Sequence, residues 1–490
     1  MQKEENFIVA IELGSSKITA IAGRKQPDGA ILVLATVQET SDSFIRKGRI
    51  NNFNKMTTSL KNMKSKLEEK LKMTVSAAYV GIGGMGMHTV KNTVTQQLSE
   101  KMLITADMVK NVKDLNISRP GNDKVILEDI PQDYKLGTQT VLDPVGIASE
   151  SIEGHFLNII ASSSITKDVE SCFTKAGINV VSTPITVLSL ADAILAEPEK
   201  RSGCVFVDMG AETTSVAIYK NNLLRHFAVI PLGGGSITRD IASVQIDEAE
   251  AEELKCKLGS AFIPEGEDSH SPIRLRDGRE LSHEEFDGLV TARAEEIVLN
   301  IKNQIKLSGY DKSQLIAGII VTGGGAMLRN LDKAYAEFTG FDKVRFVKSL
   351  KLQYRLEGKG ATAFNGDGSF DAAIALIDKG DINCCGGKIG ENKLFTEDEE
   401  AQPNAAQQGI AQPFGGTPQT IGQTETQSTE QPVEQPVEQP AEENTTPAQE
   451  EKPKAPKGPS KLNKFWNRIK GAATRIVSEE EDHFPGTKED

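Results

Sequence analysis

Two stretches of this 490-residue chain resemble each other, and this internal resemblance constrains the fold more than any other feature of the sequence. Residues 7–22 and residues 205–219 each contain an apolar run, an acidic residue, a glycine close to small hydroxylated residues, and a second apolar run. Each pattern predicts a strand, a tight turn and a second strand. The acidic residues, Glu12 and Asp208, are 196 positions apart. We therefore predict two duplicated α/β domains that face each other.

The turns of both predicted hairpins have the composition of a phosphate-binding loop. Gly14 and Gly210 let the backbone approach a phosphate closely, and successive N–H groups there form an anion-binding nest. Hydroxyl groups that can donate to phosphate, and one lysine that can neutralise it, lie in or beside the turns: Ser15, Ser16, Thr213, Thr214 and Lys17. The carboxylates of Glu12 and Asp208 are able to hold Mg²⁺, mostly through its water ligands. One such hairpin is most often an ordinary β-turn, so the evidence lies in the pair.

Two further glycine-rich segments follow the second hairpin. Residues 230–236, Ile-Pro-Leu-Gly-Gly-Gly-Ser, precede a helical run and offer a helix N-terminus for an anion near Gly234. Residues 317–331 predict a buried strand, a turn containing Gly323, Gly324 and Gly325, and the start of a helix. A nucleoside can lie against such an open backbone. Four such segments in this order predict a nucleotide site.

The net charge of −13 at pH 7 is unevenly distributed along the chain. Residues 397–451 contain twelve acidic and no basic residues, residues 452–478 contain eight basic and no acidic ones, and residues 479–490 carry −5. A near-neutral body therefore carries a patterned tail. An acidic chain argues against whole-chain nucleic-acid binding, which needs a basic surface.

The cysteines and the apolar runs exclude several classes of protein. Five cysteines without CxxC spacing predict neither a disulfide framework nor a zinc site, and they fit a reducing cytosol. We expect Cys384 and Cys385 to be surface thiols. No uninterrupted apolar run approaches 18 residues, so the sequence predicts no membrane-spanning segment.

The tail has two parts of different character. Residues 396–459 hold ten of the twenty prolines and many Gln, Glu and Thr residues, which predicts a disordered linker spanning roughly 40–50 Å. Ser460 is a candidate N-cap for an amphipathic helix whose apolar face consists of Leu462, Phe465, Trp466, Ile469, Ala472, Ala473, Ile476 and Val477. Basic residues, including Lys461, Lys464 and Arg468, flank that face.

We interpret this basic helix as a membrane-surface helix, because it carries the only tryptophan of the chain at the end of a tether. The alternative is a helix that docks on a protein partner. A single helix of this kind binds an anionic membrane weakly, so firm attachment needs many copies acting together.

The order of the four glycine-rich segments resembles the actin/Hsp70/sugar-kinase superfamily, and in detail the chain resembles the FtsA family of bacterial cell-division proteins. The resemblance covers about residues 5–378, and the layout of the tail repeats that of the family. The motifs that carry it are Gly81-Ile-Gly-Gly84, Ile104–Val109, Ile130–Tyr134, Leu142–Gly146, Lys175–Val180, Arg225–Gly234 and Ala251–Gly259.

The resemblance implies an actin-like two-domain ATPase fold with an inserted α+β subdomain, followed by a disordered linker and a C-terminal amphipathic helix. We expect domain 1 to comprise residues 1–82, 163–200 and 351–395, with the FtsA-type subdomain inserted at 83–162. Domain 2 is expected at 201–243 and 317–350, with a partner-binding subdomain at 244–316. The linker, the membrane helix and the acidic tail are expected at 396–459, 460–478 and 479–490.

The resemblance also implies ATP with Mg²⁺ as the ligand. It assigns Gly14, Ser15, Ser16 and Lys17 to the first phosphate loop, and Asp208, Gly210, Thr213 and Thr214 to the second. It further places Glu252 and Lys255 beside the ribose and adenine, and Gly323, Gly324, Gly325 and Met327 along the adenosine. The helical run 284–307 is implied to receive the C-terminal peptide of FtsZ, with Arg293, Asn303 and Lys306 as candidate contacts.

Three departures from the family pattern favour nucleotide binding over efficient hydrolysis. Glu12 stands where Asp is usual, and Ala211-Glu212 stands where two glycines are usual. Residues 183–190 contain no Gln or Glu to position an attacking water. We therefore expect weak or no ATPase activity, with ATP stabilising a conformation competent for polymerisation.

The function implied is that of a cell-division protein that binds ATP and self-associates into actin-like filaments. It would anchor the FtsZ ring to the cytoplasmic face of the inner membrane at the septum, as a peripheral protein that also meets other division proteins. The alternatives are a metabolite kinase of the superfamily, which would need a catalytic Asp aimed at a substrate hydroxyl, and a pilus-assembly adaptor with the same body. An Hsp70-type chaperone is disfavoured, because no β-rich peptide-binding domain follows residue 380.

Overall fold

The first of two similarly ordered sheets is built from the N-terminal hairpin. The computed structural model describes residues 6–118, 123–264, 266, 271–357 and 368–388, which belong to one structural unit. The sheet has the strand order β12-β7-β1-β2-β3-β20. Strand β1 is antiparallel to β2 and parallel to β7. The strands are β1 (Ile8–Leu13), β2 (Lys17–Lys25), β3 (Ile31–Thr40), β7 (Ala77–Gly81), β12 (Asn179–Ser182) and β20 (Tyr354–Leu356).

The second sheet repeats this order from the second hairpin, as β19-β18-β13-β14-β15. Strand β13 is antiparallel to β14 and parallel to β18, as β1 is to β2 and β7. The register repeats as well: Glu12 pairs with Thr19 in the first hairpin, and Asp208 pairs with Ser215 in the second. The strands are β13 (Cys204–Met209), β14 (Thr214–Lys220), β15 (Leu223–Ile230), β18 (Gly318–Thr322) and β19 (Val344–Phe346).

Helices cover the first sheet and close its core. Helix α10 packs on β1 and on α4, and it buries Ile374, Leu376 and Ile377. Fully burying such a side chain contributes roughly 1.5–3 kcal/mol, which explains why this short apolar helix holds its place. The helices and the short strand pairs of this half are α1 (Phe53–Leu71), α3 (Ser164–Lys175), α4 (Thr186–Ile194), α10 (Asp371–Lys379), β4 (Ile45–Arg46), β5 (Arg49–Ile50), β6 (Met73–Val75) and β21 (Cys385–Lys388).

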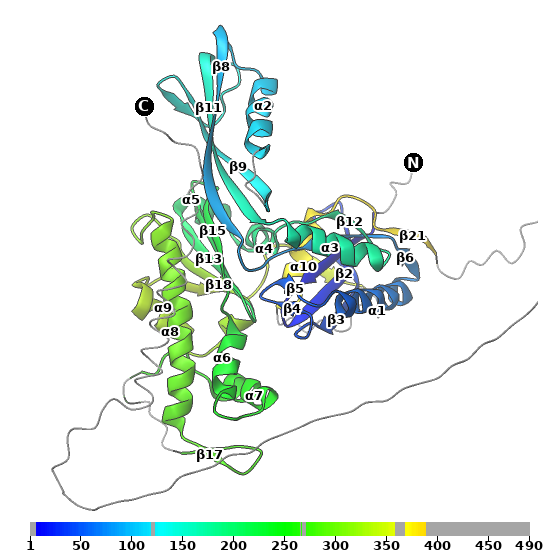
Figure 1. Cartoon of the computed structure of the whole chain (residues 1–490), viewed down its shortest axis with the longest axis vertical. Coiled ribbons are helices and arrows are strands. Elements are labelled where there is room, and N and C mark those ends of the chain that lie inside the picture. Colours follow the sequence, from blue (N-terminus) through cyan, green and yellow to red (C-terminus); the bar gives the residue numbers. More distant parts are fainter. Residues whose placement is uncertain (1–5, 119–122, 265, 267–270, 358–367, 389–490) are drawn as a thin grey trace, which may run out of the picture. The chain divides into compact units, whose positions relative to one another are not determined.

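The segment between β7 and α3 forms long strands with one helix against them (Figure 1). Its elements are β8 (His88–Leu103), α2 (Ala106–Ile117), β9 (Lys124–Leu136), β10 (Gln139–Val141) and β11 (Ala148–Ser162). Tyr134 and Phe156 meet edge to face in its core, with ring centroids 6.2 Å apart. This segment joins the second sheet through one pair, Ala228 with His88.

Helix α8 is the long helix of the second half, and it begins at an N-cap where Ser282 Oγ accepts a hydrogen bond from the Glu285 N–H. Its N-terminal turns bury Phe286 and Val290 against α6, while its C-terminal turns pack beside the second sheet. The remaining elements of this half are α5 (Glu197–Ser202), α6 (Gly234–Ala242), α7 (Glu248–Leu258), β16 (Ile273–Arg274), β17 (Glu280–Leu281), α8 (His283–Leu307), the 3₁₀ helix η1 (Gly324–Met327) and α9 (Leu331–Thr339).

The expectation that Cys384 and Cys385 are surface thiols is wrong. Both are buried, with 0% and 4% exposure, because β21 pairs with β6 and carries them into the core of the first half. Burial raises the pKa of the Cys385 thiol to about 12, so this thiol is inert at neutral pH.

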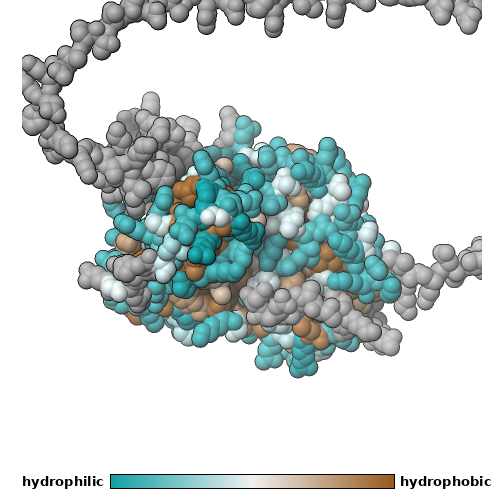
Figure 2. Space-filling view, turned by 90° about the horizontal axis from the view of Figure 1, so that it is seen from below, coloured by the Kyte–Doolittle hydropathy of each residue, from teal (hydrophilic) through white to brown (hydrophobic). Residues whose placement is uncertain are grey.

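The described residues present a largely hydrophilic surface on one face and contain helices too short or too polar to span a membrane. On the face seen in Figure 2, hydrophilic residues predominate and hydrophobic residues occur in several separate places. Within the described ranges, none of the helices combines the length and the apolarity needed to cross a membrane. The predicted linker, amphipathic helix and acidic tail lie outside the described residues.

Candidate functional site

The turn between β1 and β2 is closed by a backbone hydrogen bond and held from one side by Ser41. The Gly14 N–H donates to the Lys17 carbonyl at 3.1 Å, and a Cβ on Gly14 would lie 2.5 Å from that oxygen. Ser41 secures the turn, because its Oγ donates to the Gly14 carbonyl at 2.6 Å. Ser15 Oγ accepts a hydrogen bond from the Gly48 N–H at 2.9 Å. Ser16 is exposed in the same turn.

The turn between β13 and β14 has the same closure. The Gly210 N–H donates to the Thr213 carbonyl at 2.8 Å, which repeats the Gly14 bond 196 positions later. This turn meets the glycine-rich start of α6, because the Gly234 N–H donates to the Gly210 carbonyl at 2.9 Å. The Thr214 hydroxyl is buried and donates to the Leu232 carbonyl at 2.8 Å. This hydroxyl is therefore used within the fold rather than offered to a phosphate.

Glu12 and Asp208 bring two carboxyl groups into the same electrostatic environment. Burial, together with the charge of Asp208, raises the pKa of Glu12 to about 7, although Lys17 acts in the opposite direction. Burial raises the pKa of Asp208 to about 6. Gly323 makes room for Asp208, since a Cβ there would lie 2.5 Å from Oδ1. A divalent cation would stabilise the ionised form of both buried carboxyl groups. Carboxylate oxygens are also suitable ligands for such a cation.

The carboxylate pair is the only candidate cation site that we identify among the described residues. No group of three or more His, Cys, Asp or Glu side chains there is arranged to hold a metal ion. A cation at Glu12 and Asp208 would therefore draw its other ligands from water or from a bound phosphate, as Mg²⁺ commonly does.

The three glycines after β18 lie beside the second turn. A Cβ on Gly325 would lie 2.7 Å from Met209 Cγ, and a Cβ on Gly234 would lie 3.4 Å from the Gly325 Cα. A Cβ on Gly324 would meet no atom of the described residues within 4 Å, and Met327 is 83% exposed. The backbone here is therefore close to the second turn and open on its outer side, which suits a flat ligand.

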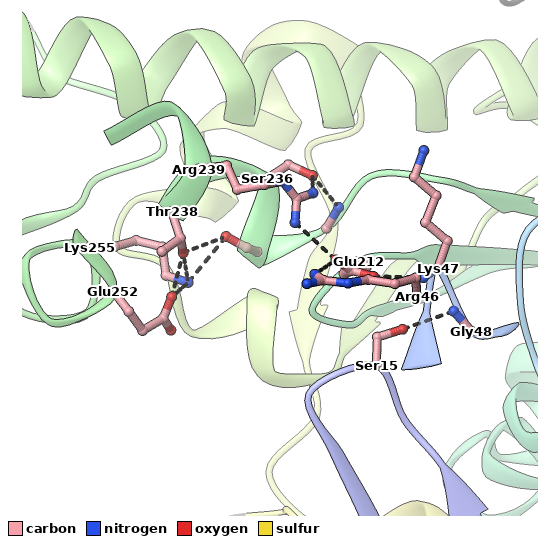
Figure 3. A network of polar contacts seen from close by, with 12 residues as sticks. Ser15, Arg46, Lys47, Gly48, Glu212, Ser236, Thr238, Arg239, Glu252 and Lys255 are labelled. Carbon is pink, nitrogen blue, oxygen red and sulfur yellow. Dashed lines mark hydrogen bonds and ion pairs between the residues drawn. The ribbon is translucent and has the colours of Figure 1, made fainter. Parts of the chain in front are cut away.

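Glu252 and Lys255 lie together on α7 and reach α6 (Figure 3). Lys255 Nζ donates to Glu252 Oε2 at 2.6 Å, to Thr238 Oγ1 at 3.0 Å and to the Gly234 carbonyl at 3.2 Å. Burial acts to raise the pKa of Glu252, but the hydrogen bonds from Lys255 and Thr238 lower it below its usual value. The pair is thus tied to the glycine-rich start of α6.

Glu212 has partners that sequence reasoning missed. Its carboxylate bonds the Lys47 N–H and the guanidinium groups of Arg46 and Arg239. The only sequence signal for these partners was Gly48, which follows Lys47 in a turn where both residues have positive φ. Spacing along the chain did not relate this turn to residue 212.

The predicted partner-binding residues differ in how free they are. Arg293 forms two bonds to Asp240, Nε–Oδ2 at 2.6 Å and Nη2–Oδ1 at 3.0 Å, and it also pairs with Glu296. Its side chain is only 17% exposed. Asn303 is half-buried and Lys306 is exposed on the same helix. Of the three, Lys306 is the residue most accessible to a partner.

The predicted membrane contacts lie outside the described residues. They are Lys461, Leu462, Lys464, Phe465, Trp466, Arg468, Ile469, Ile476 and Val477.

Comparisons with known proteins bear on both the sequence and the fold. Residues 205–363 match the family model "Cell division protein FtsA". The chain is 26% identical over 337 residues to the cell division protein FtsA of Neisseria meningitidis, covering 68% of this chain and 81% of that protein. It is 24% identical over 407 residues to the cell division protein FtsA of Escherichia coli K12, covering 80% and 94%.

Among solved structures, a PilM-PilN type IV pilus biogenesis complex matches with a TM-score of 0.53 and 15% identity, covering 76% of this chain and 98% of that chain. At this identity the match concerns the fold alone. Together these matches confirm the resemblance to the FtsA family and the actin-like α/β fold that the sequence predicted.

Proposed function

We propose that this chain, a relative of the FtsA cell-division proteins with an actin-like fold, is an ATP-binding adaptor that self-associates and attaches FtsZ to a membrane. One observation carries the nucleotide part of the proposal. Two turns of identical closure, 196 positions apart, follow the strands that carry Glu12 and Asp208, and the charge of Asp208 acts on Glu12. A duplicated pair of such turns suits a ligand held from both sides.

The ligand that fits this site is ATP with Mg²⁺. The N–H groups of both turns and Lys17 offer donors for phosphates, and Glu12 and Asp208 would hold the cation. Bound Mg²⁺ would neutralise the charge of the phosphates. The open backbone at Gly323–Gly325 and the Glu252–Lys255 pair are available to the nucleoside.

ATP in this proposal is a structural ligand with weak or no hydrolysis. The stretch 183–190, which leads into α4, has no Gln or Glu to orient a water molecule. The second turn also carries Ala211 and Glu212, which add side chains and an anion close to where the phosphates would lie. ATP would instead favour an arrangement of the chain that assembles into filaments.

We assign partner binding to helix α8 and membrane binding to the C-terminal segment 460–478. Helix α8 would receive the C-terminal peptide of FtsZ, and the exposed Lys306 is accessible to it. The basic, tryptophan-containing segment 460–478 would lie on the cytoplasmic face of the inner membrane at the division septum, where other division proteins would also bind. Self-association would bring many such segments to one membrane, and their combined binding would be much stronger than that of a single copy.

The experiment that tests the whole proposal is co-sedimentation with vesicles containing anionic lipid, in the presence of ATP and FtsZ. The full chain is compared with a chain lacking residues 460–490. We expect FtsZ to pellet with the full chain and to remain in solution with the shortened one. Equal pelleting of FtsZ with both chains would contradict the adaptor function.

A further inference from the structure

Glu212 is a buried anion on the second turn. Only 7% of its surface is exposed, although a carboxylate is costly to bury without partners. It accepts a hydrogen bond from the Lys47 N–H at 2.7 Å, one from Arg46 Nη1 at 2.9 Å and one from Arg239 Nη1 at 3.0 Å (Figure 3). Burial acts to raise the pKa of Glu212, but these donors lower it, so the group is ionised at neutral pH.

These donors come from both halves of the chain. Arg46 ends β4 and Lys47 lies in the turn that follows, both in the first half, while Arg239 lies on α6 in the second. Two guanidinium groups and a backbone N–H are the donors that proteins use to bind phosphate. In this structure a carboxylate of the chain itself occupies them.

The same donors lie directly beside both phosphate-type turns. The Gly48 N–H, next in sequence to Lys47, donates to Ser15 Oγ of the first turn. The Gly235 N–H, one helical turn before Arg239, donates to the Ala211 carbonyl of the second turn at 2.7 Å. A phosphate held between the turns would therefore lie within reach of the donors that Glu212 now engages.

Both arginines reach solvent, whereas the carboxylate between them is buried. The side chains of Arg46 and Arg239 are 52% and 43% exposed, whereas the Glu212 side chain is 8% exposed. The solvent-facing sides of both guanidinium groups are therefore accessible to a second anion, although Arg239 Nη2 also donates to Ser236 Oγ at 3.2 Å.

We propose that Glu212 is a specificity-determining residue of the nucleotide site, which competes with the terminal phosphate of a nucleoside triphosphate for Arg46 and Arg239. This inference rests on the proposed nucleotide binding. The competition lowers the preference of the chain for a triphosphate over a diphosphate, because a diphosphate lacks the γ-phosphate that would compete with Glu212 for these donors. Removing the carboxylate frees both arginines for the triphosphate.

The test compares the dissociation constants of the Mg²⁺ complexes of ADP and a non-hydrolysable ATP analogue, using the full chain. Glu212→Ala is expected to raise the ratio of the ADP constant to the analogue constant about tenfold, the contribution of one charge-assisted hydrogen bond. Glu212→Gln, which keeps the shape of the side chain and guards against misfolding of the alanine variant, is expected to move the ratio in the same direction. The matched control is Glu253→Gln on α7, which pairs with Lys257 instead and should leave the ratio unchanged.

A second substitution tests whether the effect of removing the Glu212 carboxylate depends on the arginine donors that it frees. Adding Arg46→Ala to Glu212→Ala should return the ratio toward that of the wild type, because one of the freed donors is lost. An unchanged ratio in both Glu212 variants would overturn this inference while leaving the nucleotide site intact. Failure of the wild type and of both variants to bind either nucleotide would overturn the proposed function and this inference together.

Discussion

The carboxyl groups of Glu12 and Asp208 end matching strands of two hairpins, and the charge of Asp208 raises the pKa of Glu12. The two residues are 196 positions apart, so their electrostatic interaction depends on the fold and not on neighbouring positions in the sequence. Without a cation, burial disfavours the ionised form of each group, and the charge of Asp208 further disfavours that of Glu12.

The first prediction concerns the effect of pH on stability without Mg²⁺. The pKa of Asp208 is about 6 in the folded chain against an ordinary 3.8, so between these values the folded chain holds a proton that the unfolded chain has released. Stability therefore falls as the pH rises through this window. The Asp208→Asn variant should not lose stability in this way. Between pH 4 and pH 8, its unfolding temperature should therefore rise by several degrees relative to that of the wild type.

Thermal unfolding followed by circular dichroism checks this prediction. Mg²⁺ added at pH 8 should raise the unfolding temperature of the wild type more than that of Asp208→Asn, because the cation replaces the lost protons. Parallel pH profiles of the two proteins would contradict the assignment.

The second prediction concerns Lys255, which bonds the Gly234 carbonyl and Thr238 at the start of α6. Lys255→Met should weaken the binding of MgATP about tenfold, because a charged donor beside the nucleotide is lost. Isothermal titration calorimetry measures this. Lys257→Met on the same helix is the control, since Lys257 is exposed and pairs with Glu253. Equal affinities of the two variants would exclude Lys255 from the site.

The third prediction separates folding from partner binding on α8. Arg293→Ala should lower the free energy of unfolding by about 1–3 kcal/mol, because it leaves Asp240 half-buried without its two bonds. Lys306→Ala should change stability by less than about 0.5 kcal/mol. It should nevertheless weaken binding of the C-terminal peptide of FtsZ, measured by fluorescence anisotropy. Unchanged peptide binding by Lys306→Ala would move the partner site elsewhere.

The fourth prediction concerns the tail. Trp466→Glu should abolish co-sedimentation of the full chain with anionic vesicles, because it places a charge on the apolar face of the predicted helix. Phe484→Glu changes an aromatic residue outside that helix and should leave pelleting intact. Thermal unfolding of both variants checks that the body remains folded. Retained pelleting of Trp466→Glu would refute the anchor.

The duplicated hairpins were predictable because their information is local. The apolar runs around Glu12 and Asp208 specify strands, and Gly14 and Gly210 specify turns, so even the 196-residue offset of the register could be read from the sequence. The start of α6 at Gly234 and the end of β18 before Gly323 follow from equally local signals.

The contacts of Glu212, Thr214 and Cys384 could not be predicted in the same way. Whether Thr214 faces a ligand or the Leu232 carbonyl depends on how β14 meets the segment before α6. Cys384 is buried where the strand beginning at Cys385 pairs with residues 73–75, and its own N–H donates to the Phe7 carbonyl. Glu212 is a departure from the family pattern in the sequence. Its partners Arg46 and Lys47 are 166 and 165 positions away, so only the fold brings them to it.

The most direct test of this account is the Mg²⁺ dependence of ATP binding, measured by isothermal titration calorimetry. The wild type and the double variant Glu12→Gln/Asp208→Asn are titrated with ATP in MgCl₂ and in EDTA. We predict that the wild type binds ATP more tightly in MgCl₂ than in EDTA, and that the double variant loses most of this gain. A wild type that does not bind MgATP, or a double variant that keeps the full gain, would contradict the account.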